Sequence, residues 1–361
     1  MENLERYLSN GVEKIVKGIL RSSLKNPAAS IFMLRYADAS KRAEKIRREY
    51  ENSGEHIPPF LIASITSQCN LHCKGCYARA NSSCQDYDYR DTLTSDQWGE
   101  IMTQAEDLGI SFVLLAGGEP FTRPDILEEA GKHDRIIFPV FTNGTMLEEK
   151  TMRFLVKNPN LMPVISMEGS QETTDERRGE GIYARIQDAM ANMKKAGILF
   201  GASVTVTKKN VTEVLSEEFV KDLGRAGVKA VVYVEYVPVD KISEDLAPDD
   251  ATREYMEERM AELRSGDEEL LLIAFPGDEK TSGGCLAAGR GFFHINAQGG
   301  AEPCPFSPYS DTNLTSTSLL QALKSPLFVR LRDTGVLMES HSGGCVLFDR
   351  EEQVRELTGQ V

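Results

Sequence analysis

The strongest constraint on the fold is a regular alternation of strand-like and helix-like segments between residues 61 and 237. Short apolar runs rich in β-branched residues are expected to be strands at residues 61–65, 111–116, 135–142, 162–167, 199–206 and 228–237. Stretches with helical periodicity separate them, at residues 93–107, 125–130, 147–156, 182–196 and 211–226. Such alternation is typical of a parallel sheet covered by helices. The sequence therefore predicts an α/β fold, a partial (β/α)6 barrel with its active site at the carboxyl ends of the strands.

The composition narrows the class of protein. The chain has 361 residues, 41% of them hydrophobic, which is enough apolar material for a sizeable core. A net charge of −14 argues against general binding to the nucleic-acid backbone. No apolar run approaches the ~20 residues of a membrane-spanning helix, and the charged start does not resemble a signal peptide. Because the seven cysteines are odd in number and grouped in motifs, we expect metal thiolates in a cytoplasmic protein rather than disulfides.

Residues 1–57 are expected to form a helical, basic, amphipathic N-terminal segment. Apolar residues recur at helical spacing from Leu4 to Leu20, and Asn26 and Pro27 are suited to start a second helix. Residues 1–50 hold 11 Lys+Arg and 6 Asp+Glu, although the whole chain is acidic. Two hypotheses remain: a hairpin packed on the rest of the chain, or a surface that contacts an anionic membrane or an acidic partner.

Three cysteines follow the first expected strand, Cys69, Cys73 and Cys76, in the spacing C-x3-C-x2-C. A structural zinc site normally takes four protein ligands, and this loop offers three. Thiolates are the usual ligands of iron–sulfur clusters. Three of them on one short loop suit a [4Fe–4S] cluster whose fourth iron stays open to another molecule.

This motif, followed by the aromatic Tyr77, resembles the signature of the radical S-adenosylmethionine (SAM) family. Later segments resemble the family's other motifs in order, beginning with Gly117-Gly118-Glu119-Pro120 after the second expected strand. The resemblance implies that the open iron binds the amino and carboxylate groups of SAM. It also implies that reductive cleavage of SAM yields a 5′-deoxyadenosyl radical, which abstracts hydrogen from a substrate.

The resemblance and the strand-end positions together give a set of candidate SAM-contacting residues. The set comprises Tyr77, Gly117, Gly118, Glu119, Pro120, Asn143, Ser166, Glu168, Arg178, Ser203, Thr205 and Val237. Glu119 is expected beside the SAM amino group, and Arg178, with Arg177 as the alternative, at the carboxylate. Asn143 either borders the same pocket or shapes a left-handed turn. Ser203 and Thr205 share one face of a strand and either reach the adenosine or satisfy one another.

The C-terminal part carries three further cysteines, Cys285, Cys304 and Cys345, around Gly299. This pattern resembles the twitch or SPASM-like extension that holds an auxiliary Fe–S cluster in many radical SAM enzymes. The C-x2-C-x5-C-x3-C run of a full SPASM extension is absent, so one auxiliary [4Fe–4S] cluster is expected, with zinc as the rival. Its fourth ligand is left open between Cys84, which is otherwise a free thiol, another side chain, solvent and the substrate.

These observations divide the chain into four expected parts. Residues 1–57 are the N-terminal segment, residues 58–240 the radical SAM barrel, residues 241–280 an acidic connector, and residues 281–361 the extension that holds the auxiliary cluster. The alternation of strands and helices is expected to stop at Leu270.

The expected function is that of a radical SAM enzyme acting on an unidentified small-molecule, lipid or peptide substrate. The auxiliary cluster would aid oxidation, crosslinking or substrate binding, and an external donor such as flavodoxin or ferredoxin would supply the reducing electron. One alternative is a peptide-modifying maturase of the SPASM type; another, of a different class, is a non-catalytic Fe–S or zinc binding module. We expect a cytoplasmic location, with membrane-surface contact through residues 1–57 as a further hypothesis. The sequence assigns no general acid or base, and neither His72 nor His294 is claimed as a ligand.

Overall fold

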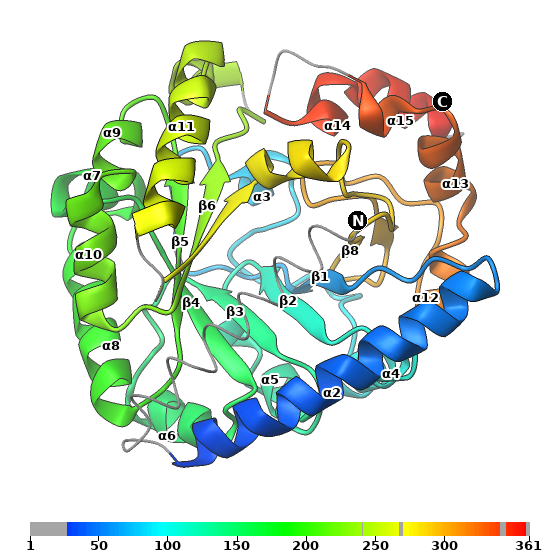
Figure 1. Cartoon of the computed structure of the whole chain (residues 1–361), viewed down its shortest axis with the longest axis horizontal. Coiled ribbons are helices and arrows are strands. Elements are labelled where there is room, and N and C mark those ends of the chain that lie inside the picture. Colours follow the sequence, from blue (N-terminus) through cyan, green and yellow to red (C-terminus); the bar gives the residue numbers. More distant parts are fainter. Residues whose placement is uncertain (1–26, 240, 267–269, 340–343, 359–361) are drawn as a thin grey trace.

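The computed structural model describes residues 27–239, 241–266, 270–339 and 344–358. Its centre is a nine-stranded sheet in the order β7-β6-β5-β4-β3-β2-β1-β8-β9 (Figure 1). Strands β1 to β7 pair in parallel throughout. They are β1 Phe60–Thr66, β2 Phe112–Gly117, β3 Phe138–Thr142, β4 Leu161–Met167, β5 Gly201–Val206, β6 Ala230–Glu235 and β7 Leu271–Phe275. Because β7 and β9 are the two ends of the order, the sheet stays open in the described residues, and the predicted partial barrel is confirmed.

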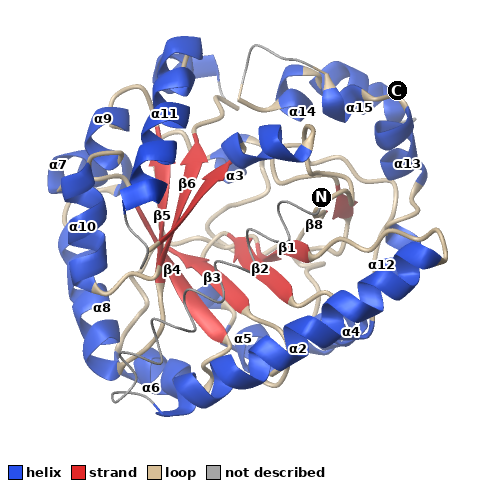
Figure 2. Cartoon of the chain, in the orientation of Figure 1, coloured by secondary structure: helices blue, strands red, loops and turns tan. Residues whose placement is uncertain are grey.

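Helices surround the curved sheet (Figure 2). Those between successive parallel strands are α3 Tyr77–Ala80, α4 Ser95–Asp107, α5 Pro124–Gly131, α6 Glu149–Lys157, α7 Gln171–Arg178, α8 Ile182–Ala196, α9 Val211–Val214, α10 Glu217–Ala226 and α11 Asp250–Gly266. The C-terminal helices are α12 Leu319–Ala322, α13 Pro326–Asp333, α14 Val346–Asp349 and α15 Glu351–Leu357. Short 3₁₀ turns complete the chain at η1 Pro120–Thr122, η2 Lys241–Leu246, η3 Gly277–Ser282 and η4 Val336–Met338.

Local sequence signals explain several of these boundaries. Thr94 caps α4 and forms a reciprocal capping box with Gln97, whose amide oxygen accepts from the Thr94 backbone. The expected single helix at 211–226 is instead broken into α9 and α10, because the Ser216 hydroxyl accepts from Phe219 N and starts a new helix.

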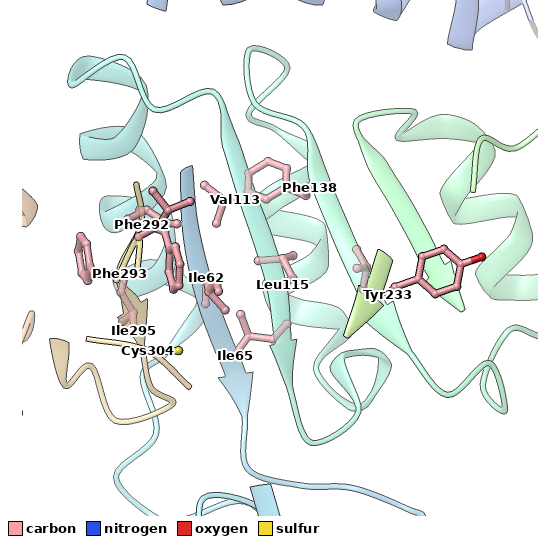
Figure 3. Packing of buried hydrophobic residues seen from close by; sticks show 14 of the residues in the cluster. Ile62, Ile65, Val113, Leu115, Phe138, Tyr233, Phe292, Phe293, Ile295 and Cys304 are labelled. Carbon is pink, nitrogen blue, oxygen red and sulfur yellow. The ribbon is translucent and has the colours of Figure 1, made fainter. Parts of the chain in front are cut away.

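The C-terminal part differs from the expectation in two ways. The strand β7 continues the parallel alternation beyond Leu270, where we expected it to stop. The hairpin of β8 (His294–Ile295) and β9 (Ala301–Glu302) joins the other end of the sheet, since β8 pairs in parallel with β1. Ile62 of β1 lies beside Phe292, whereas Ile65 lies toward Leu115 of β2, and all of them belong to one continuous core (Figure 3).

The N-terminal segment is described from residue 27, so the expected helix over residues 2–24 lies outside the described residues. Helix α2 (Pro27–Asn52) begins at the proline that the sequence indicates. Its Phe32, Met33 and Tyr36 are buried against residues that begin β2 and β7, including Phe112 and Leu271. The Tyr36 hydroxyl also donates to the carbonyl of Ser111 at 3.1 Å. Helix α2 therefore packs on the amino ends of the strands. None of the described helices is both long enough and apolar enough to span a membrane.

Candidate functional site

The loop from the end of β1 to α3 carries Cys69, Cys73 and Cys76, which are free and half-buried. Its start is held by a hydrogen bond from Cys69 N to Gln85 O at 2.8 Å. Arg79 of α3 also fixes the loop, with its guanidinium donating to the carbonyls of Cys69 and Leu71 at 3.2 and 2.8 Å. The three thiols thus lie on a short loop whose backbone is fixed by its neighbours.

The glycine pair Gly117 and Gly118 is required by that same loop. A Cβ on Gly118 would lie 2.0 Å from the carbonyl oxygen of Gln68, and one on Gly117 would lie 2.2 Å from that of Thr66. Gly117 also has a φ of +121°, in the region that L side chains rarely adopt. Gly118 N donates to Thr66 O at 2.9 Å and Glu119 N to Gln68 O at 2.7 Å. The end of β2 therefore clamps the residues that lead into Cys69.

Glu119 is 1% exposed, and its carboxylate accepts hydrogen bonds from other groups of the protein. It accepts from Thr142 Oγ1 at 2.7 Å, from Asn143 N at 2.8 Å and from Phe121 N at 3.2 Å. Burial raises the pKa of Glu119 to about 7, although these hydrogen bonds act in the opposite direction. Pro120 follows as the first residue of η1. In this structure Glu119 ties the end of β2 to the end of β3.

Asn143 extends this network to the cysteine loop. Its side-chain amide donates to Asn70 Oδ1 at 2.9 Å, and Asn70 in turn donates to Thr145 Oγ1 at 2.8 Å. The second interpretation of Asn143 was a left-handed turn. The left-handed residue is the next one, Gly144, with a φ of +78°. The contacts of Asn143 fit both interpretations, because its Oδ1 also accepts from Thr145 N at 2.9 Å and so helps to shape the turn at Gly144.

An ion triad closes the other side of the cysteine loop. Glu168 is 1% exposed and pairs with Arg177 Nη1 at 2.5 Å and with Arg178 Nε at 2.6 Å. Burial alone would raise the pKa of Glu168, but the two guanidiniums hold it below its ordinary value. Arg177 O accepts from Lys74 N at 2.8 Å, which joins the triad to the cysteine loop.

The triad leaves one donor unsatisfied. Arg177 Nε is buried with no hydrogen-bond partner, whereas Arg177 Nη1 also donates to Thr205 Oγ1 at 3.1 Å. Arg178 gives both its Nε and its Nη2 to Glu168. The unpaired buried donor and the adjacent thiols fit a bound anionic group such as a carboxylate.

The remaining candidates are spread around the strand ends. Ser166 of β4 and Ser203 of β5 lie opposite one another in register, and Thr205 follows on β5. Tyr77 begins α3, with its ring 4.8 Å from that of Phe306. Val237, one of the candidate SAM-contacting residues, also lines a pocket formed by the C-terminal cysteines.

Cys84 belongs with the first set of cysteines. It is buried, and its thiol hydrogen-bonds Cys69, which lowers the pKa of Cys69. It is not among the residues that line the pocket of the C-terminal cysteines. Of the open choices for the fourth auxiliary ligand, Cys84 is therefore the one that this placement disfavours.

The C-terminal cysteines Cys285, Cys304 and Cys345 line one small pocket, which Glu279, Phe275, Pro276 and Phe306 also line. Burial raises the pKa of all three thiols. Within the described ranges, no three His, Cys, Asp or Glu side chains are gathered as for a single metal ion. Three thiols that line one pocket are nevertheless the donor set that Fe–S clusters use.

A polar pocket of about 580 Å³ lies between the hairpin and the segments at 81–83 and 308–313. On its wall Ser64 Oγ lies 2.7 Å from His294 Nε2, and His294 Nδ1 lies 2.7 Å from Glu302 Oε2. Asn296 Nδ2 donates to the other Glu302 oxygen at 2.6 Å. His294 and Glu302 are 3% and 5% exposed. No sequence motif predicts this series; the one available signal is that His294 and Glu302 flank the glycine turn of a short hairpin.

Comparison with known proteins identifies the class. Residues 63–223 match the Radical SAM superfamily. The AdoMet-dependent heme synthase of Methanosarcina barkeri (strain Fusaro / DSM 804) is 27% identical over 303 residues, which cover 76% of this chain and 85% of the relative. The Fe-coproporphyrin III synthase of the same strain is 28% identical over 185 residues, which cover 50% of this chain and 44% of the relative. The solved structure of Streptococcus suis SuiB bound to precursor peptide SuiA has a TM-score of 0.65 at 18% identity, covering 84% of this chain and 76% of SuiB.

Residues 63–223 are therefore a radical SAM domain, and the chain is an enzyme of that type, for which a [4Fe–4S] cluster and SAM are the cofactors. The family match supports this over the alternative of a non-catalytic metal-binding module. The likeness to SuiB shows that the fold is shared.

Proposed function

We propose that this enzyme oxidises a polar substrate held in the pocket beside Ser64, removing one hydrogen atom, one proton and one electron. The observation that carries the proposal is the hydrogen-bonded series Ser64–His294–Glu302 on the wall of that pocket. Cys304 follows Glu302 by two residues. The series from Ser64 to Glu302 offers a route for a proton. One of the C-terminal thiols, which suit an electron acceptor, therefore lies two residues further along the chain.

The first cofactor site would be formed by Cys69, Cys73 and Cys76, with SAM against the strand ends that carry Glu119, Ser166 and the Arg177–Arg178 pair. A [4Fe–4S] cluster and SAM bound there supply hydrogen-atom abstraction through a 5′-deoxyadenosyl radical. The protein's part is to fix the loop, which Gly118 and Arg79 do, and to present the buried Arg177 Nε to an anionic group. An external donor such as flavodoxin or ferredoxin would supply the electron for cleavage.

The proton would leave through the pocket wall. Because the Glu302 carboxylate faces His294 Nδ1, that nitrogen donates, and Nε2 of the neutral ring accepts the Ser64 hydroxyl proton. A proton given up by the substrate to Ser64 Oγ can therefore pass to Nε2. Glu302, fixed by Asn296, stabilises the imidazolium that results.

The second cofactor site would be formed by Cys285, Cys304 and Cys345, where an auxiliary [4Fe–4S] cluster would supply an electron acceptor. Tyr77 follows Cys76 directly, and its ring lies 4.8 Å from that of Phe306, which lines the pocket of the C-terminal cysteines. The start of α3 therefore lies near both proposed cofactor sites.

The decisive test separates SAM cleavage from substrate oxidation. Reconstituted protein is incubated anaerobically with SAM, dithionite and a fractionated pool of small molecules, and both 5′-deoxyadenosine and products lighter by two hydrogens are measured. Changing Cys69, Cys73 and Cys76 together to Ala should abolish 5′-deoxyadenosine. His294→Gln should lower product formation by roughly 10²–10⁴-fold, the range of general acid–base catalysis, and leave 5′-deoxyadenosine measurable.

His133→Gln is the matched control, since His133 lies near Glu106, away from the pocket. Equal product formation by the His294 and His133 variants would refute the proton route. 5′-Deoxyadenosine formed by the triple cysteine variant would refute the assignment of the first site.

A peptide substrate is the second candidate. It is suggested by the fold shared with SuiB, whose solved structure contains its precursor peptide. The pocket volume of about 580 Å³ lies within the roughly 300–1,000 Å³ of small-molecule sites, which fits a small molecule or a single peptide side chain. Repeating the assay with a peptide fraction distinguishes the two, because only one fraction should yield the lighter product.

A further inference from the structure

We propose that the Glu279 carboxylate is the fourth protein ligand of the auxiliary cluster, which completes a set of three thiolates and one carboxylate. The inference rests on the proposed function in one respect, that Cys285, Cys304 and Cys345 hold a cluster. It adds the residue that would complete the coordination of the cluster. The coordination decides whether the cluster can bind the substrate or only transfer electrons.

The first support is position. Glu279 lines the same pocket as the three cysteines, and its Oε1 lies 3.9 Å from Cys285 Sγ. The remaining lining residues are Val237, Phe275, Pro276, Phe306 and Val346. A carboxylate that faces a largely apolar pocket with three thiols is poorly solvated, which favours its binding to a cation.

The second support is that the backbone around Glu279 is built to hold it there. Glu279 lies in η3, where its N donates to Pro276 O at 2.8 Å and its O accepts from Gly284 N at 3.2 Å. The guanidinium of Arg290 donates to the carbonyls of Cys285 and Gly283, so a fixed positive charge lies beside the loop. That charge partly offsets the negative charge that four anionic ligands bring together.

The third support is that the other candidate ligands, two acidic side chains and Cys84, are already bound to other groups. Both oxygens of Glu302 are engaged, by His294 and Asn296. Asp278 accepts from Arg264 and from Ala274 N. Cys84 hydrogen-bonds Cys69. Glu279 is the carboxylate that lines the pocket.

A purely local role for Glu279 makes a different prediction. Its Oε1 also accepts from Leu286 N at 3.4 Å, so the side chain could serve only to fix the loop that carries Cys285. Glutamine keeps an oxygen acceptor of the same shape for Leu286 N but is a far weaker ligand for iron than a carboxylate. The Glu279→Gln substitution therefore separates ligation from loop fixation.

Closure of the site has a consequence for the reaction. An auxiliary cluster with four protein ligands has no open iron for the substrate, so it would act by electron transfer. The sequence analysis gave several possible roles for the auxiliary cluster. A cluster with four protein ligands fits a role in oxidation of the substrate and does not fit binding of the substrate to the cluster.

The experiment uses full-length protein in which Cys69, Cys73 and Cys76 are Ala, so that only the auxiliary cluster contributes. Iron and sulfide are counted, and the EPR spectrum of the reduced protein is recorded with and without cyanide, a small ligand for an open iron. With Glu279 present the spectrum should not change on adding cyanide. In Glu279→Gln it should differ from the parent spectrum and shift with cyanide, and in Glu279→Cys the insensitivity to cyanide should return.

Asp278→Asn is the matched control, a neighbouring carboxylate directed at Arg264, and it should behave as the parent. A parent spectrum that shifts with cyanide, or a Glu279→Gln protein with the parent's iron content and spectrum, overturns the assignment of Glu279. A parent protein that holds zinc or no iron overturns the auxiliary cluster itself, which is a separate failure. If the triple-alanine protein does not fold, the same spectra are taken on the holoenzyme with SAM bound, since SAM occupies the open iron of the first cluster.

Discussion

Replacing Gly118 by Ala should displace the loop that carries the first set of cysteines. The new Cβ would lie 2.0 Å from Gln68 O, 2.3 Å from Gln68 C and 2.9 Å from Cys69 N. All three are backbone atoms, so no rotamer change relieves the overlap. Reaching the 3.4 Å at which ordinary contact begins requires a shift of about 1.4 Å at the start of the cysteine loop.

The free energy involved is large enough to move the loop and too small to unfold the chain. Inserting a methyl group into a packed site costs typically about 1–3 kcal/mol. Gly224→Ala provides the matched control, because Gly224 lies in α10 and a Cβ added there would have nothing within 4 Å. There the same substitution should stabilise by about 0.5–1 kcal/mol, since alanine loses less backbone freedom in a helix.

The two variants are compared by urea unfolding of the cluster-free proteins and by iron content and 5′-deoxyadenosine after reconstitution. Gly118→Ala should lower the unfolding midpoint, lose iron from the first site and lose SAM cleavage, while Gly224→Ala should raise the midpoint and keep both. A Gly118→Ala protein with full iron and full cleavage would show that the close approach of the two backbones is not needed.

Three further predictions concern charge, pH and the N-terminal segment. Glu168→Gln leaves the partly buried guanidiniums of Arg177 and Arg178 without their counter-charge, and should lower the free energy of unfolding by about 3–5 kcal/mol; an unchanged urea midpoint would contradict the ion triad. Glu119 has its pKa raised by burial from 4.5 to about 7, so its contribution to stability is complete below pH 4.5 and is lost as the pH rises through about 7. The difference in unfolding free energy between wild type and Glu119→Gln should therefore fall by roughly 3 kcal/mol between pH 4 and pH 8, and a difference that rises with pH would refute the burial argument. Deleting residues 1–26 should reduce co-sedimentation with anionic liposomes and leave 5′-deoxyadenosine intact, whereas deleting residues 1–52 should also lower stability, because it removes the buried face of α2; equal stability of the two truncations would argue against that packing.

The fold of the barrel could be predicted because it depends on signals that are local in sequence. The strands from 61 to 237 are short apolar runs, and single residues mark where two helices start: Pro27 is the first residue of α2, and Thr94 is the N-cap of α4. The strand β7 could not be predicted, because its five residues follow a long acidic helix and carry no alternation of their own. The two-residue strands β8 and β9 are too short to show any periodicity. The place of β8 is set by its pairing with β1, whose residues are about 230 positions earlier, and β9 pairs with β8.

The residues of the candidate site also fall into those that could be predicted from the sequence and those that could not. Residues in compact motifs, such as Cys69, Cys73 and Cys76, can be selected from their spacing alone. The role of Glu168 could not, because its partners become visible only when α7 folds back over β4 and brings two arginines to one carboxylate. His294 needed the register of β8 against β1, which places it within hydrogen-bond reach of Ser64. Glu279 lies in a turn with no motif, and only the convergence of three segments places it with the cysteines.

The pairing of β8 with β1 has a consequence for how this protein can be taken apart. The first strand of the barrel is shielded along one side by the C-terminal hairpin, so a chain cut after residue 280 would present β1 as an uncovered sheet edge. Unprotected apolar edges template pairing between molecules and lead to aggregation. The C-terminal cysteines therefore have to be studied by point substitution, since removing the segment that carries them would confound the loss of a metal site with the loss of a soluble barrel.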